Sequence, residues 1–192
     1  MKFAKICWSL GSILVNVTIA IYIALQSKSP KVFADRLVYI NENWAIYGTH
    51  WKAEFFIMTV MTIGALYFAI HLRKMEWVII TIGQFIILIT YPLMIGGYEN
   101  ASLEVGLAVN QIATSTFVLG NVFFLGGMVY LYVGDTILNP TLRYVGIAIA
   151  SIAFIVFIIT YIGLITWQQA ILVGPLVNVL YLLNAYYGYK LE

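Results

Sequence analysis

Long runs of apolar residues, separated by short polar segments, dominate the chain. Six of these runs are long enough to cross a bilayer as helices, which takes about 20 residues each. They lie near residues 4–25, 54–72, 76–97, 104–133, 142–166 and 169–189. Backbone groups find no water in hydrocarbon, so we expect helices despite the many Ile and Val residues. The pattern predicts an all-α bundle of six transmembrane helices, with residues 1–192 forming one transmembrane domain.

The segments between the last five runs are short and carry polar or turn residues. Short connections make neighbouring spans antiparallel. Residues 26–53 are the exception, since they are longer than a connection needs. Within them Phe33, Leu37 and Ile40 recur at helical spacing, and aromatic residues follow. We therefore predict an interfacial helix in the segment 30–52, which leads into the second span.

Composition supports a lipid environment. The chain is 62% hydrophobic and only 9% charged, whereas a soluble domain carries about 25% charged residues. The lipid bilayer is therefore the expected partner, and the net charge of +2 without a basic cluster argues against nucleic acid. A single cysteine, Cys7, excludes an intrachain disulfide, and no Cys/His spacing indicates a metal. We expect no metal and no cofactor.

The distribution of Lys and Arg predicts the orientation. Basic residues stand before the first span, between spans two and three, at the start of span five and after span six. The connections at 98–103 and 166–169 contain no Lys or Arg. We expect a multi-pass protein of the cell membrane with both termini in the cytoplasm. The segment 26–53 then faces outward, although it carries four basic residues of its own.

The stretch YGTHWKAEFF, residues 47–56, concentrates polar and aromatic groups at the start of the second span. In a helix Tyr47, His50 and Glu54 share one face. A His–carboxylate pair one turn apart is suited to acid–base work, with Asp35 and Glu104 as further outer-side candidates. The alternative is a hydrated helix end with belt aromatics, in which both side chains are solvated.

Uncharged polar residues occur within the spans, whereas no Asp, Glu, Lys or Arg lies at the centre of one. This argues against a proton-driven transporter with a buried central carboxylate. Asn110, Thr114 and Asn121 place polar groups on one face of span four, and Asn178 follows the Gly174-Pro175 break in span six. Together with Tyr47 these residues are candidate ligand contacts. Hydrogen bonding between helices is the alternative.

The segment GGMVYLYVGDTILNPTLRYVGIAIASIAFIV, residues 126–156, resembles an uncharacterised family of small bacterial polytopic membrane proteins. Pro140, Arg143 and Gly146 carry the resemblance, and FADRLVYINENWAIYG is similar to that family's segment before span two. The family is a domain of unknown function. The resemblance therefore implies the architecture and supplies no activity or site residues.

These patterns lead to three alternative functions. The first is binding or translocation of a small or lipophilic molecule between the helices, without catalysis. The second is a membrane-embedded enzyme acting on a lipid or isoprenoid at the outer face, for which no catalytic motif is present and no catalytic residue is assigned. The third is a structural or assembly subunit, using a helix face that contains Gly120, Phe124 and Gly127. The sequence leaves the oligomeric state open.

Overall fold

A computed structural model describes residues 1–191 of the chain as an assembly of helices, and no strand occurs in that range. The elements, in chain order, are α1 (Lys2–Gln26), α2 (Phe33–Glu42), α3 (Trp44–Leu72), α4 (Met75–Tyr98), α5 (Leu103–Val133), α6 (Pro140–Tyr161), α7 (Trp167–Ala170), the 3-10 helix η1 (Ile171–Val173) and α8 (Gly174–Lys190). The predicted all-α class and the additional helix between the first two spans are confirmed.

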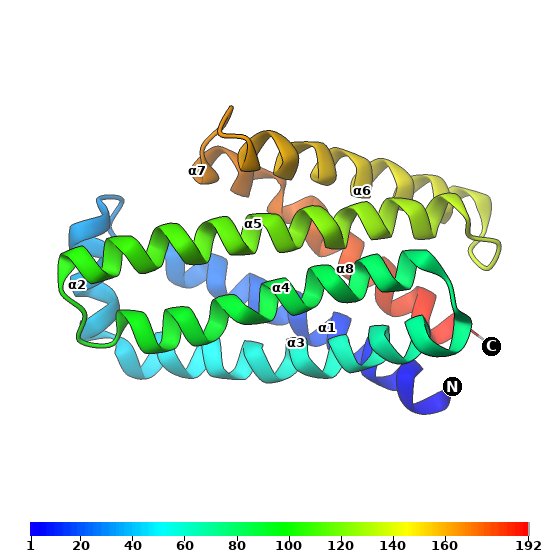
Figure 1. The fold of residues 1–192 in the computed structure, drawn as a ribbon, viewed down its shortest axis with the longest axis horizontal. Coiled ribbons are helices and arrows are strands. Elements are labelled where there is room, and N and C mark those ends of the chain that lie inside the picture. The colour runs from blue at the N-terminus through cyan, green and yellow to red at the C-terminus, as the bar shows by residue number, and fades with distance from the viewer. Residues whose placement is uncertain (192) are drawn as a thin grey trace.

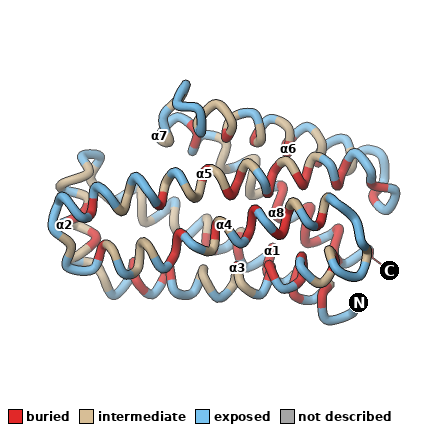
Figure 2. Tube along the Cα trace, viewed as in Figure 1, coloured by how far each residue is buried: buried red, intermediate tan, exposed pale blue. Residues whose placement is uncertain are grey.

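Within residues 1–191, six helices are long and apolar enough to cross a membrane, the sixth being the broken segment from Trp167 to Lys190. Large apolar side chains cover the outside of the bundle, for example Phe56 at 68% and Leu172 at 79% exposure. Figure 2 shows buried positions along the inward faces of the helices and exposed positions around them. A surface of this kind is stable in lipid, so the protein is a multi-pass integral membrane protein.

The long helices lie side by side along the longest axis of the molecule (Figure 1). The two termini lie at one end of the bundle, and α2 lies at the opposite end, beside the turn between α4 and α5. An even number of spans requires both termini on the same side. The structure thus agrees with the predicted topology but does not show which side is cytoplasmic.

Glycines allow α4 and α5 to pack closely. A Cβ atom on Gly120 would lie 2.9 Å from the backbone oxygen of Gly83, and one on Gly127 would lie 2.9 Å from the backbone nitrogen of Ile80. Phe124 is also buried. Our expectation that this face of α5 is exposed for a partner was wrong, because α4 of the same chain already covers it.

Several boundaries differ from the sequence prediction. The fifth span, expected at 142–166, ends as a helix at Tyr161. The helix of the second span begins at Trp44 rather than near residue 54. The expected interfacial segment 30–52 is therefore divided at Asn43, with α2 before it and the first turns of α3 after it. Tyr47 and Trp51 are buried, so packing extends the helix beyond its apolar run. Pro175 stands in the first turn of α8 and interrupts the last span as predicted.

Candidate functional site

The first turns of α3 direct His50 and Glu54 into the bundle. Only 6% of the His50 side chain and 13% of the Glu54 side chain remain exposed. The two residues stand one helical turn apart, and Nε2 of His50 lies 3.6 Å from Oε2 of Glu54. That separation is too long for a hydrogen bond, and Nε2 is buried without a partner among residues 1–191. The interpretation of these groups as solvated helix-end residues was wrong.

Helix α1 supplies the facing groups. The hydroxyl group of Thr18 donates a hydrogen bond of 3.1 Å to Oε1 of Glu54, and it also lies 2.9 Å from the backbone oxygen of Val15. A hydroxyl group has one proton, so these two acceptors share it. One turn further along α1, the ring of Tyr22 stacks almost parallel to the ring of His50, with 5.8 Å between their centres. The hydrogen bond from α1 to the Glu54 carboxyl group is therefore a shared one.

Two further tyrosines complete the surroundings of Glu54. Tyr91 comes from α4 and Tyr181 from α8, and both are buried. Their phenol groups lie within electrostatic reach of the Glu54 carboxyl group, as does that of Tyr22. These three tyrosines come from three helices other than the one that carries Glu54, and they place phenol groups near its carboxyl group. We call Thr18, Tyr22, His50, Glu54, Tyr91 and Tyr181 the Glu54 site.

The Glu54 site lies inside the membrane-spanning part of the bundle. Thr18 precedes the end of α1 at Gln26 by eight residues, which corresponds to about 12 Å along a helix. An ionisable side chain at such a depth is costly unless it is paired or used, and it is a functional candidate for that reason. The sequence placed Glu54 at the border of a span. In the structure α3 begins at Trp44, and Glu54 lies further inside the bundle, beside Thr18 of α1.

The other acidic candidates remain outside this site. Asp35 and Glu104 are exposed, and so are Glu42 and Glu99. Within residues 1–191, no group of three or more His, Cys, Asp or Glu side chains is placed to hold a metal ion. The acid–base partners suggested for Glu54 are thus reduced to His50.

The five residues predicted to contact a ligand make separate interactions. The Tyr47 hydroxyl donates to the backbone oxygen of Leu25 at 3.2 Å, and Asn110 accepts a bond of 3.0 Å from Tyr98. The amide group of Asn121 donates to Phe117 in its own helix. Tyr47 and Asn110 therefore join neighbouring helices, whereas the Asn121 side chain bonds within α5.

Asn178 and Thr114 retain more freedom. The backbone oxygen of Asn178 accepts a bond of 2.8 Å from Asn16, whereas its side-chain oxygen is buried without a partner among the described residues. Thr114 lines a pocket of about 140 Å³, which Trp167 and Thr160 also line. The two residues thus retain polar groups for a ligand, but the structure gives no contact that joins them to the Glu54 site.

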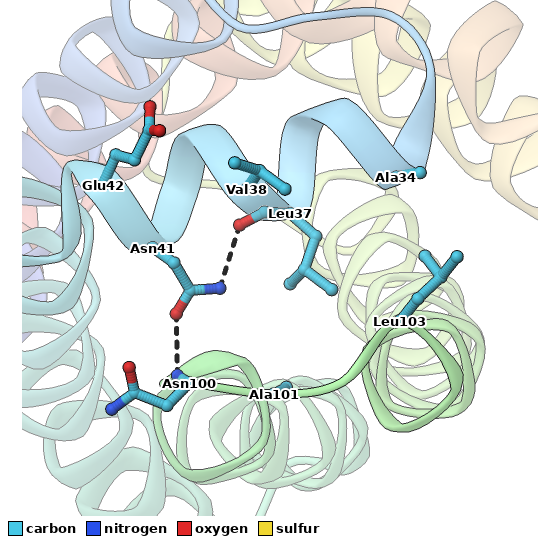
Figure 3. Close-up of a pocket in the computed structure, with 8 residues that line it drawn as sticks. All are labelled: Ala34, Leu37, Val38, Asn41, Glu42, Asn100, Ala101 and Leu103. Atoms are coloured by element: carbon cyan, nitrogen blue, oxygen red, sulfur yellow. Dashed lines mark hydrogen bonds between the residues drawn. The ribbon is translucent and has the colours of Figure 1, made fainter.

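A larger hollow of about 470 Å³ lies between α2 and the turn from α4 to α5. Figure 3 shows Leu37, Val38 and Leu103 along it, with Asn41 and Asn100 at its polar edge. Asn41 accepts a bond of 2.7 Å from the Asn100 backbone, and its amide nitrogen donates to Leu37. The polar atoms of Asn41 therefore fasten α2 to the bundle, and the groove itself is mainly apolar.

Sequence reasoning missed four of the six residues of the Glu54 site. Tyr22, Tyr91 and Tyr181 resemble ordinary belt or core aromatics in the sequence, and Thr18 is one of several uncharged polar residues within the spans. The spacing of Thr18 and Tyr22, one turn apart on α1, matches that of His50 and Glu54 on α3. This equal spacing is the sequence feature that could have indicated that the two pairs face each other. It becomes informative only once the register of α1 against α3 is known.

Comparisons of the chain with models of protein families, with curated proteins and with solved structures give no match. The resemblance to an uncharacterised family of bacterial membrane proteins therefore stays a prediction.

Proposed function

We propose that this integral membrane protein binds a small or lipophilic molecule between its helices, at the Glu54 site, and translocates it. The observation that supports this proposal most directly is the buried carboxyl group of Glu54 beside the unpartnered Nε2 of His50. Buried polar atoms in proteins nearly always have a hydrogen-bond partner. A ligand that accepts from or donates to His50 would provide the missing one.

The construction of the site also favours a ligand. Its side chains come from α1, α3, α4 and α8, so a molecule bound there would lie between helices, as ligands of helical bundles do. Three of the six residues are tyrosines, whose rings present apolar surface. The hydroxyl groups, the carboxyl group and the imidazole provide polar groups that could fix the orientation of a ligand.

Photolabelling tests the proposal. Membranes that contain the full-length protein are irradiated with a neutral phenylalkyl diazirine, and mass spectrometry locates the adducts. We expect saturable labelling of Tyr22 and Tyr181, which an excess of the same phenylalkane without the diazirine suppresses. Lipid-facing Phe85, which is 49% exposed, serves as the internal reference for labelling from the bilayer.

Labelling that rises in proportion to probe concentration at Tyr22, Tyr181 and Phe85 alike would contradict the proposal. A matched pair of variants localises the effect further. Thr18→Leu fills space beside Glu54 and is expected to reduce the saturable labelling. Ser115→Leu, on an exposed position of α5, is expected to leave it unchanged.

A membrane-embedded enzyme acting on a lipid or isoprenoid is the second candidate, and the geometry of His50 and Glu54 favours it. An imidazole nitrogen 3.6 Å from a carboxyl oxygen can exchange a proton with it after a small movement. Incubation of the protein with an isoprenyl phosphate, followed by mass spectrometry, separates the two functions. Formation of a product that His50→Gln abolishes would favour the enzyme, whereas binding without turnover favours translocation.

A further inference from the structure

We infer that the ligand of the Glu54 site is an organic cation with an apolar body. This inference rests on the proposed function, since it specifies which small molecules the site selects. The positive group of the ligand would lie against the Glu54 carboxylate, and its apolar part would lie against the rings of Tyr22, Tyr91 and Tyr181.

The first argument is charge. A carboxylate removed from water requires an opposite charge close by. His50 is charged only when it is protonated, and its Nε2 lies 3.6 Å from Oε2 of Glu54. The nearest basic residue along the chain, Lys52, is exposed and stands half a turn away on α3. A cationic ligand would place an opposite charge beside Glu54 even when His50 is neutral.

The second argument is the aromatic lining. The faces of aromatic rings carry negative potential and attract ammonium groups, most strongly where water is excluded. Tyr22 and His50 are stacked in parallel at one side of Glu54. Tyr91 of α4 and Tyr181 of α8 are buried, and their phenol groups lie near Glu54. A carboxylate with phenol groups of three helices nearby suits a substituted ammonium ion.

The same lining disfavours an inorganic cation. Metal ions such as Ca²⁺ take six or more oxygen ligands. Across residues 1–191, no cluster of three or more His, Cys, Asp or Glu side chains offers such a set. Phenol rings offer apolar ring faces rather than charged oxygen ligands. They therefore suit an ammonium ion whose substituents are carbon groups.

The site is also reachable. The Glu54 side chain keeps 13% of its surface exposed, and Tyr22 is only half-buried. A cation with an apolar body that is bound at the membrane surface could therefore approach Glu54 along α1.

Two isosteric probes test the inference on the unmodified, full-length protein in detergent. One is a phenylbutyl trimethylammonium ion, and the other is its neutral analogue, in which carbon replaces nitrogen. Isothermal titration calorimetry is expected to give at least about tenfold tighter binding of the cation. Glu54→Gln is expected to abolish this preference, whereas Glu104→Gln, which alters an exposed carboxylate, preserves it. Size-exclusion chromatography verifies that both variants are folded.

The possible failures are distinguishable. If the neutral analogue binds as tightly as the cation, the inference is overturned while the proposed function stands. If the cation binds more tightly but Glu54→Gln retains the preference, the Glu54 site is not the cation site and the inference is again overturned. If neither probe binds and the diazirine gives no saturable labelling, both the inference and the proposed function are contradicted.

Discussion

The hydroxyl group of Thr18 on α1 donates a hydrogen bond of 3.1 Å to the carboxyl group of Glu54 on α3, across 36 residues of sequence. This contact fixes the register between the first two spans at the level where the site lies. It also explains why an acidic residue near the start of a span is directed inward rather than toward water. The carboxyl group has an interhelical partner there.

Thr18→Val tests this contact with a side chain of almost the same shape. We expect the loss of the donor to lower the free energy of unfolding by about 0.5–1.5 kcal/mol and to weaken binding of the ammonium probe. Titration with a denaturing detergent, followed by circular dichroism, measures the stability. Thr62→Val is the control, because Thr62 is also buried but donates to Met58 in its own helix. Equal effects of the two substitutions would show that the contact with Glu54 adds nothing.

Close packing of α4 on α5 leads to a second prediction. In Gly83→Ala the added Cβ atom would lie 2.7 Å from the backbone oxygen of Gly120, and neither backbone can move aside as a flexible side chain would. We expect a loss of about 1–3 kcal/mol in stability and a lower thermal midpoint. Gly96→Ala, on the same helix, has no atom within 4 Å of the new Cβ and is expected to be neutral or slightly stabilising. A lower midpoint for Gly96→Ala than for Gly83→Ala would contradict the packing described.

The predicted orientation is tested by cysteine labelling in a Cys7→Ala background. Lys28 stands in the connection from α1 to α2, and α2 lies at the end of the bundle opposite the termini (Figure 1). Lys74 stands in the turn from α3 to α4, at the end that carries both termini, and both lysines are exposed. A membrane-impermeant maleimide is expected to modify Lys28→Cys in intact cells. It should modify Lys74→Cys only after the membrane is permeabilised. The opposite pattern would place both termini outside.

Much of the architecture could be predicted because hydrocarbon leaves the backbone few alternatives. Runs such as 76–97 and 104–133 differ from α4 and α5 by one residue at the ends, since charged or turn residues flank them. The early start of α3 at Trp44 was not predictable from hydropathy. Its first turns are polar and aromatic, and burial of Tyr47 and Trp51 against the bundle determines their structure.

The site was predictable only in part. The spacing of His50 and Glu54 indicated a shared face, but whether that face pointed to water or to protein depends on how α3 packs against α1. Asn110 and Asn121 illustrate the converse case. Both looked like lining for a cavity, but their amides bond to Tyr98 and to the backbone of Phe117, because hydrogen bonds must be satisfied locally in the membrane interior.

Chemical modification tests the central claim most directly, namely that Glu54 is a carboxyl group inside the membrane bundle and belongs to a ligand site. Dicyclohexylcarbodiimide dissolves in the hydrocarbon and adds to carboxyl groups there as an N-acylurea, which mass spectrometry can locate. We predict modification of Glu54, protection of Glu54 by the phenylbutyl trimethylammonium probe, and no modification of exposed Asp35 or Glu104. Modification of Asp35 and Glu104 with Glu54 unreacted, or a rate at Glu54 that the probe leaves unchanged, would contradict the account.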